Sequence, residues 1–348
     1  MGVLDAVTGG ATRRLAVAAA YGGGGVGLAG ALAAGVLLGQ ARLARAAIPL
    51  AEAPPPRCDG RYGQEYPGQP LRLAVLGDSS AAGYGVQRPR DTPGALLAAG
   101  LAQRLHRPVL VRCVAVVGAT SPTLSPQVEL ATAFRPDLAV ILVGGNDVTH
   151  RIRVTVATRY LAQAVRELRA GGTRVVVGTC PDLGAIRPIQ PPLRWLARRW
   201  SRELAAAQTV AVVRAGGSTV SLGDLIGPVF VRDPHTMFAA DRFHPSADGY
   251  ATACAAILPT LLSEATAATA GPAPAGAGGA GRTRGEALRG LVQAALEAAR
   301  NAGTEVTAAG AAGWGRGPAG LWVSLRHRVR LLTERRQDPA PAGVAEPG

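Results

Sequence analysis

The stretch LAVLGDSSAAGYGV (residues 73–86) begins as an aliphatic run and ends in Gly-Asp-Ser-Ser, followed by glycines and small residues. An aliphatic run without alternating polar residues is typical of a strand buried on both faces. In a parallel sheet, ligands bind beyond the carboxyl ends of the strands. The stretch therefore predicts a buried strand that presents Gly77, Asp78 and Ser79 at the binding edge of an α/β sheet.

The residues that follow alternate between short apolar runs and helical patterns. The apolar runs lie at 72–76, 109–117, 138–143, 173–178 and, more weakly, 210–213. The helical patterns lie near 93–105, 125–134, 155–170, 192–208 and 247–263. This alternation predicts right-handed βαβ units and a parallel sheet covered by helices on both faces. We expect one domain over residues 71–265, a length that suits a single α/β unit.

The composition of the 348-residue chain argues against several classes of protein. The chain has no lysine, so all 37 basic residues are arginine, and the net charge is +14. No nucleic-acid-binding motif accompanies this charge, so we expect no nucleic-acid partner. The four cysteines form no C-x-x-C pair and no two histidines have the spacing of metal ligands, so we expect neither a metal nor a cofactor. No pattern indicates an oligomeric state.

An uncharged segment, residues 15–41, precedes the expected domain. As a helix it would be about 40 Å long at 1.5 Å per residue, enough to span a bilayer. We expect residues 1–45 to anchor the protein in a membrane. The arginines on the two sides are nearly balanced and leave the orientation open. A cleaved signal peptide, which would make the protein secreted, and a buried helix are the alternatives.

Two further segments flank the expected domain. Residues 46–70 are rich in proline and glycine and are expected to be a linker. Residues 266–348 begin with a low-complexity stretch and contain two short helical patterns, at 286–300 and 321–336. The second pattern is amphipathic and arginine-rich, which fits either a helix on a membrane surface or a loosely docked tail.

Ser79 needs a base to act as a nucleophile, because a serine hydroxyl is weakly nucleophilic at neutral pH. His244 lies just before a predicted helix start, and Asp241 precedes it by three residues. In a turn, this spacing can bring the carboxylate to one ring nitrogen and leave the other nitrogen for the serine. The spacing alone is weak, because a capped helix start also explains it.

Two other positions fall at expected strand ends. Gly118 ends the run VAVVG, where a glycine lets its backbone N–H approach a substrate closely. Asn146 follows the run at 138–143, and its side-chain N–H₂ can donate to a developing oxyanion. Each residue taken alone also fits an ordinary turn.

Together, Gly-Asp-Ser, Gly118, the Gly-x-Asn-Asp block and Asp-x-x-His occur in an order that resembles the SGNH hydrolases, also called the GDSL esterase/lipase family. The resemblance covers the expected domain and implies a three-layer α/β/α, flavodoxin-like parallel sheet. It implies that Ser79 is the nucleophile, His244 the base and Asp241 the orienting carboxylate. It also implies an oxyanion hole made by the Ser79 and Gly118 backbone N–H groups and the Asn146 side chain.

The resemblance implies a serine esterase or lipase that cleaves carboxylic esters, of small molecules or lipids, through an acyl-enzyme on Ser79. Two alternatives stay open. One is an acyltransferase that uses the same triad and transfers the acyl group to a sugar or lipid alcohol. The other is a non-catalytic, membrane-attached binding protein. The sequence does not encode the substrate or its acyl-chain length in a readable pattern.

Overall fold

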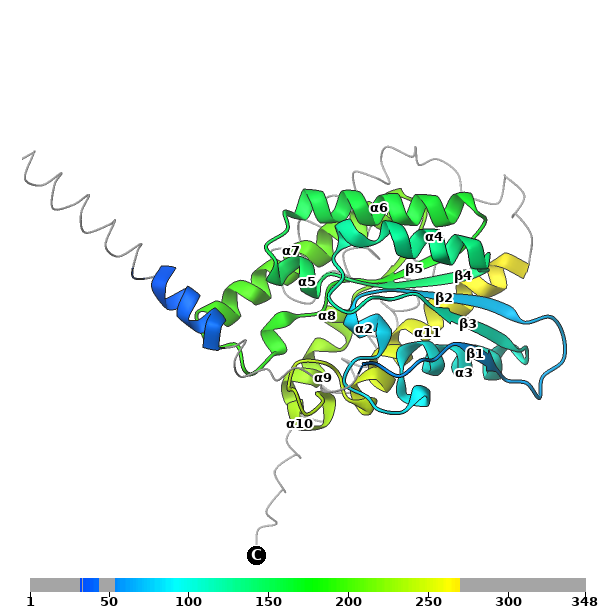
Figure 1. The fold of residues 1–348 in the computed structure, drawn as a ribbon, viewed down its shortest axis with the longest axis horizontal. Helices are drawn as coiled ribbons and strands as arrows, with labels where there is room; N and C mark the ends of the chain where they lie inside the picture. The colour runs from blue at the N-terminus through cyan, green and yellow to red at the C-terminus, as the bar shows by residue number, and fades with distance from the viewer. Residues whose placement is uncertain (1–31, 33, 44–53, 270–348) are drawn as a thin grey trace, which may run out of the picture.

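The computed structural model describes residues 32, 34–43 and 54–269. A six-stranded sheet forms its centre, in the order β1-β3-β2-β4-β5-β6 (Figure 1). The strands are β1 (Gly60–Tyr62), β2 (Leu71–Gly77), β3 (Val109–Cys113), β4 (Leu138–Leu142), β5 (Arg174–Gly178) and β6 (Ser218–Val220). Strands β2 to β6 pair in parallel, and β1 pairs antiparallel with β3 at one edge.

Ten labelled helices occur among the described residues. The longer ones are α3 (Pro93–Leu105), α4 (Ser125–Phe134), α6 (Val154–Ala170), α7 (Leu193–Arg214) and α11 (Ala247–Thr269). The short ones are α2 (Ser79–Ala82), α5 (Gly145–Thr149), α8 (Leu222–Leu225), α9 (Gly227–Arg232) and α10 (Pro234–Met237). Three single-turn 3-10 helices lie at Pro89–Asp91, Ser121–Thr123 and Leu183–Ala185.

Helices cover both faces of the sheet. Leu73 and Val75 of β2 pack into a core with α3 and α11. Ala74 and Leu76 of the same strand pack into a core with α4, α6 and α7 on the opposite face. Figure 1 shows the same separation of the helices into two layers. The fold is therefore the predicted three-layer α/β/α arrangement, and its parallel strands have the flavodoxin-like order.

The last strand of the sheet differs from its prediction. Residues 210–213, expected to be a weak strand, lie inside α7, and the sheet instead ends with β6. The prediction was wrong because a short aliphatic run suits a buried helix as well as a strand. Val212 is fully buried in the core shared by α4, α6 and α7, so this run packs its apolar side chain from a helix.

The C-terminal part of the expected linker belongs to the folded domain. Gly60, Arg61 and Tyr62 pair with β3, and Cys58 just before them is buried in the core. The Tyr62 hydroxyl also donates to the Cys58 carbonyl oxygen at 2.9 Å. An edge strand of three residues has too little apolar periodicity to be recognised between prolines and glycines.

Several predictions fall mainly on residues that the structure does not describe. The tail from residue 270 and positions 46–53 of the expected linker are among them, and so is most of the expected membrane anchor at 15–41. Residues 34–43 are described and are helical. Within the described ranges, no helix has both the length and the apolarity to cross a membrane.

The end of β2 approaches β4 so closely that only glycine fits there. Gly77 has a φ of +133°, and a Cβ atom built on it would lie 1.9 Å from the Leu142 carbonyl oxygen. The same oxygen accepts the Asp78 backbone N–H at 2.9 Å. Gly77 therefore lets the chain turn out of the sheet two residues before Ser79 without losing the contact with β4.

We predict that Gly77→Ala lowers the free energy of unfolding by at least about 3 kcal/mol, because backbone strain and a clash with a neighbouring backbone add together. Gly172→Ala is the matched control: Gly172 also has a positive φ, +85°, but no atom lies within 4 Å of its Cβ position. We expect a loss of about 1 kcal/mol there. Urea denaturation of both variants measures the difference, and equal losses would contradict the close-approach account.

Candidate active site

Ser79 is the first residue of α2 and is separated from the end of β2 by Asp78 alone. Asp78 caps this helix, and its side chain accepts the Ser80 backbone N–H at 2.9 Å. The buried Gln127 of α4 holds the turn from the other side, accepting the Gly77 N–H at 2.7 Å and donating to the Gly77 carbonyl at 3.0 Å. The backbone N–H and carbonyl groups of Gly77 are thus both bound by one side chain, so the position of Ser79 is defined by the surrounding core.

A chain of two hydrogen-bond contacts links Ser79 to Asp241. His244 Nε2 lies 2.9 Å from Ser79 Oγ, and His244 Nδ1 lies 2.6 Å from Asp241 Oδ2. Asp241 and Ser79 are buried, and the His244 side chain is 12% exposed. This is the arrangement in which a histidine can take a serine proton while a carboxylate holds the ring in place.

The loop that carries Asp241 is shaped by its own hydrogen bonds. Asp241 Oδ1 accepts the backbone N–H groups of Phe243 and His244, both at 2.9 Å. Arg242, between Asp241 and Phe243, has a φ of +56°, which reverses the chain within this tight turn. The turn therefore converts the three-residue spacing of Asp241 and His244 into a direct side-chain contact.

Two aromatic rings enclose the His244 ring. Tyr84 lies at a ring-centroid distance of 4.5 Å and Phe243 at 4.8 Å. The Tyr250 hydroxyl donates to the Tyr84 carbonyl oxygen at 2.7 Å, which ties the loop after α2 to α11. These contacts limit rotation of the imidazole and shield it partly from water.

Gly118 reaches the site because the loop after β3 continues along the end of β2. The Val114 and Val116 N–H groups donate to the carbonyl oxygens of Val75 and Gly77, at 2.9 and 3.1 Å. Gly118 follows with a φ of +82° and open space around it. Among the described residues, no hydrogen-bond acceptor pairs with the backbone N–H of Gly118 or of Ser79.

Asn146 lies in α5, just beyond β4. Its Nδ2 donates to the Ala119 carbonyl oxygen at 3.0 Å, which joins it to the loop that carries Gly118. The neighbouring Asp147 is fully buried and accepts both the N–H and the hydroxyl of Ser121, at 2.9 and 2.6 Å. Because Asn146 binds Ala119, the residue after Gly118, these bonds fix Gly118 and Asn146 relative to each other.

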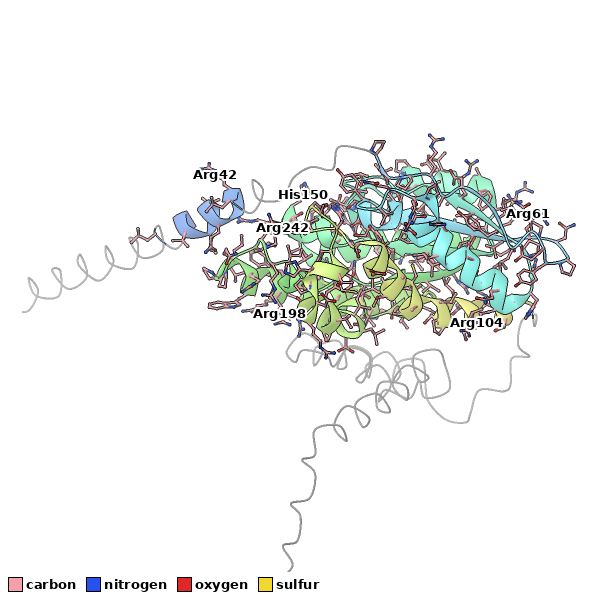
Figure 2. All side chains as sticks on the ribbon, turned by 90° about the horizontal axis from the view of Figure 1, so that it is seen from below. Arg42, Arg61, Arg104, His150, Arg198 and Arg242 are labelled. Carbon is pink, nitrogen blue, oxygen red and sulfur yellow. The ribbon has the colours of Figure 1, made fainter. Side chains whose placement is uncertain are left out.

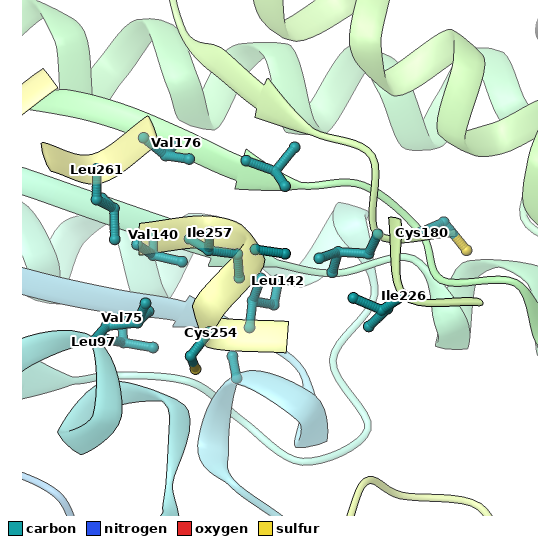
Figure 3. Close-up of a cluster of buried hydrophobic side chains, with 14 of the residues drawn as sticks. Val75, Leu97, Val140, Leu142, Val176, Cys180, Ile226, Cys254, Ile257 and Leu261 are labelled. Carbon is teal, nitrogen blue, oxygen red and sulfur yellow. The ribbon is translucent and has the colours of Figure 1, made fainter. Parts of the chain in front are cut away.

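Ser79, Asn146 and His244 line two hollows in the surface. One is a small apolar cavity of about 110 Å³. Its walls include Leu142, Ile226, Phe230, Phe238, Cys254 and Ile257, of which Figure 3 labels Leu142, Ile226, Cys254 and Ile257 within the core. The other is a groove of about 630 Å³, which Gly118 also lines. The reactive atoms therefore lie where a small cavity and a larger groove meet.

Two carboxyl groups of the site have perturbed pKa values in opposite directions. Burial acts to raise the pKa of Asp241, but the hydrogen bonds from the His244 ring and from the Phe243 and His244 N–H groups outweigh it and hold the pKa below its ordinary value. Burial raises the pKa of Asp78 to about 6, against the lowering effect of the Ser80 N–H and of His244. Asp241 is thus the carboxyl suited to remain ionised beside an imidazolium.

The structure brings together all five residues that the sequence singled out around Ser79, since Ser79, Gly118, Asn146 and His244 line one groove and Asp241 contacts His244. Sequence reasoning missed Gln127 and Tyr84, and it gave no role to Asp147, the last residue of the Gly-x-Asn-Asp block. All three support the site through tertiary contacts, which a local pattern does not reveal. Within the described ranges, no group of three His, Cys, Asp or Glu side chains is arranged to hold a metal ion.

Comparison with known proteins identifies a matching family model and a related curated protein. The model of the GDSL-like Lipase/Acylhydrolase family matches residues 75–252. The curated protein GDSL-like esterase Rv1075c of Mycobacterium tuberculosis (strain ATCC 25618 / H37Rv) is 44% identical over 230 residues, which are 63% of this chain and 73% of that protein.

Solved structures with similar folds include TesA, with a TM-score of 0.42 and 22% identity over 57% of this chain and 97% of that chain. Axe2, an acetylxylan esterase from Geobacillus stearothermophilus, has a TM-score of 0.43 and 19% identity over 55% of this chain and 94% of that chain.

We predict that Asp78→Asn becomes more stable relative to the wild type as the pH rises from 4 to 7. The pKa of Asp78 is about 6 when folded and 3.8 ordinarily, so in this window the folded protein binds more protons at Asp78 than the unfolded chain does. The contribution of Asp78 to the stability of the wild type therefore falls as the pH rises. Asparagine still caps α2 but cannot ionise.

The gain over the wild type should reach at most about 3 kcal/mol, from a shift of roughly two pKa units at 1.36 kcal/mol each. Urea unfolding of both proteins at four pH values between 4 and 7 measures it. A difference that stays constant across this range would show that Asp78 does not titrate there.

Proposed function

The chain belongs to the GDSL-like lipase/acylhydrolase family of carboxylic ester hydrolases, and we propose that Ser79, His244 and Asp241 are its catalytic triad. The observation that carries this proposal is the pair of contacts of His244, 2.9 Å to Ser79 Oγ and 2.6 Å to Asp241 Oδ2. A serine hydroxyl becomes a nucleophile when a base of this kind accepts its proton. The histidine in turn needs a carboxylate that fixes its tautomer.

In the acylation step, Ser79 Oγ attacks the ester carbonyl carbon while its proton passes to His244 Nε2. Asp241 stabilises the imidazolium that forms, and its lowered pKa keeps it ionised in this role. The carbonyl oxygen becomes an oxyanion, which accepts hydrogen bonds from the Ser79 and Gly118 N–H groups and from the Asn146 side chain. His244 then returns the proton to the departing alcohol, and an acyl-enzyme on Ser79 remains.

In the second step, water replaces the alcohol. His244 takes a proton from the water as its oxygen attacks the acyl carbon, and the same three donors hold the second oxyanion. Ser79 leaves with the proton from His244, and the carboxylic acid is released. Each donor is already held in place before the reaction, so little reorganisation accompanies either step.

We place the acyl group in the cavity of about 110 Å³ beside Ser79. Leu142, Ile226, Phe230 and Ile257 provide apolar walls for it. Burying each methylene of an acyl chain in such a site contributes about 0.8 kcal/mol. Because the cavity is small and residues of α3, α9 and α11 line it, it favours short acyl groups over long ones.

We predict that Ser79→Ala reduces kcat for p-nitrophenyl acetate by at least about 10⁴, because the nucleophile is lost. Ser80→Ala is the matched control: it keeps the backbone N–H that binds Asp78 and removes only a side-chain hydrogen bond to the same carboxylate, so this variant should retain activity within a few-fold of wild type. Steady-state hydrolysis assays of both variants measure the effect. The opposite pattern would assign the nucleophile to Ser80.

We predict that Asn146→Ala lowers kcat by about 10² to 10³ and changes KM by only a few-fold, since its amide would act on the oxyanion and not on the ground-state ester. Because Asn146 also donates to Ala119, a thermal-unfolding measurement must accompany the kinetics to show that the variant is folded. A rise in KM with an unchanged kcat would remove Asn146 from the oxyanion hole.

A further inference from the structure

A helical segment outside the α/β domain, residues 34–43, lies against the domain near α7 (Figure 1). Leu37, Gln40 and Ala41, spaced three and one residues apart, are half-buried and form one face of the segment. Val36, Leu38 and Leu43 are exposed on its other sides. The segment therefore makes a one-sided contact with the domain.

Gln40 makes this contact with both ends of its side-chain amide. Its Nε2 donates to the Pro191 carbonyl oxygen at 2.6 Å, and its Oε1 accepts the Leu193 backbone N–H at 3.1 Å. Leu193 is the first residue of α7, so its N–H has no partner within the helix and is free to bind the Gln40 oxygen. These two hydrogen bonds hold the Gln40 side chain in one orientation against the backbone at the start of α7.

Ala41, next to Gln40, lines the same groove of about 630 Å³ as Ser79 and His244. Leu193, Ala197 and Trp200 of α7 also line it, and their spacing of four and three residues puts them on one face of that helix. Residues 34–43 and α7 therefore border the groove together.

The groove and the small cavity can hold substrate groups of different size. It is nearly six times as large by volume, and apolar side chains from several elements line it. Its lining also includes the polar residues His150 and Arg151; Figure 2 shows His150 at the same end of the molecule as Arg42 of the segment. An acyl group in the small cavity leaves the alcohol part of the ester to occupy this groove.

We propose that residues 34–43 complete the wall of an alcohol-binding groove for esters of bulky apolar alcohols, with Gln40 as the residue that positions this wall. The proposal rests on the proposed function of Ser79 as the nucleophile. Loss of the wall lowers the affinity for a large alcohol group, because that group then keeps more of its apolar surface in water. A small alcohol group lies close to Ser79 and contacts the wall little.

Two acetate esters with activated aryl alcohols test the proposal: p-nitrophenyl acetate, with one ring, and resorufin acetate, with three fused rings. We expect Gln40→Ala to raise the ratio of their KM values, resorufin acetate over p-nitrophenyl acetate, about tenfold, since it removes two hydrogen bonds that hold the wall. Gln163→Ala is the matched control. Gln163 is also helical, and its amide donates to the exposed Glu167 of α6. The control should leave the ratio unchanged.

A second variant changes the groove itself and leaves the contacts of the segment intact. Ala41→Leu keeps the Gln40 contacts but adds bulk to the lining, so it should raise the same KM ratio by narrowing the groove. Hydrogen exchange of residues 34–43 reports docking separately, and we expect faster exchange in Gln40→Ala than in the wild type. A KM ratio within twofold of wild type in both variants, with exchange in Gln40→Ala increased, would overturn the proposal.

The same assays distinguish this inference from the assignment of the nucleophile. If Ser79→Ala hydrolyses both esters at the wild-type rate, the proposed function is wrong, whatever the KM ratio. If Ser79→Ala is inactive and Gln40→Ala behaves as the wild type in both KM ratio and exchange, the function stands and the wall does not.

Discussion

The 2.9 Å contact between His244 Nε2 and Ser79 Oγ joins residues 165 positions apart, and much of the domain is arranged to make it possible. Gly77 lets β2 turn against β4, and Gln127 binds both the backbone N–H and the carbonyl oxygen of Gly77. Near the C-terminal end of the domain's sequence, Asp241 shapes the turn that orients His244 toward Ser79. A proton transfer needs this geometry to within a few tenths of an ångström, which rigid elements supply better than loops do.

The site is asymmetric around this contact. On one side lies a small apolar cavity that side chains of the core line, and on the other lies a groove bordered by α7 and residues 34–43. Because an ester has an acyl and an alcohol part on opposite sides of its carbonyl group, such a site can select for each part separately. The proposed role of Gln40 would then make the segment that precedes the domain a determinant of substrate choice, even though it lies outside the residues that match the family.

The sequence predicted those parts of the structure that depend on local pattern. The strands β2, β4 and β5 are buried on both faces, so their sequences are continuous aliphatic runs. A strand with one face in water would instead alternate apolar and polar residues. The run at 210–213 failed because tertiary packing placed it in α7. Ser79 and His244 stand in recognisable motifs, whereas Gln127 and Gln40 act through contacts between segments distant in sequence, which no local pattern encodes.

The central claim is that His244 activates Ser79 as the nucleophile. The most direct test is peptide mapping by mass spectrometry after treatment with a fluorophosphonate, which reacts with an activated serine. The account predicts one adduct, located on Ser79, and loss of this adduct in His244→Ala. An adduct on Ser80, or labelling of Ser79 that persists at the wild-type rate in His244→Ala, would contradict it.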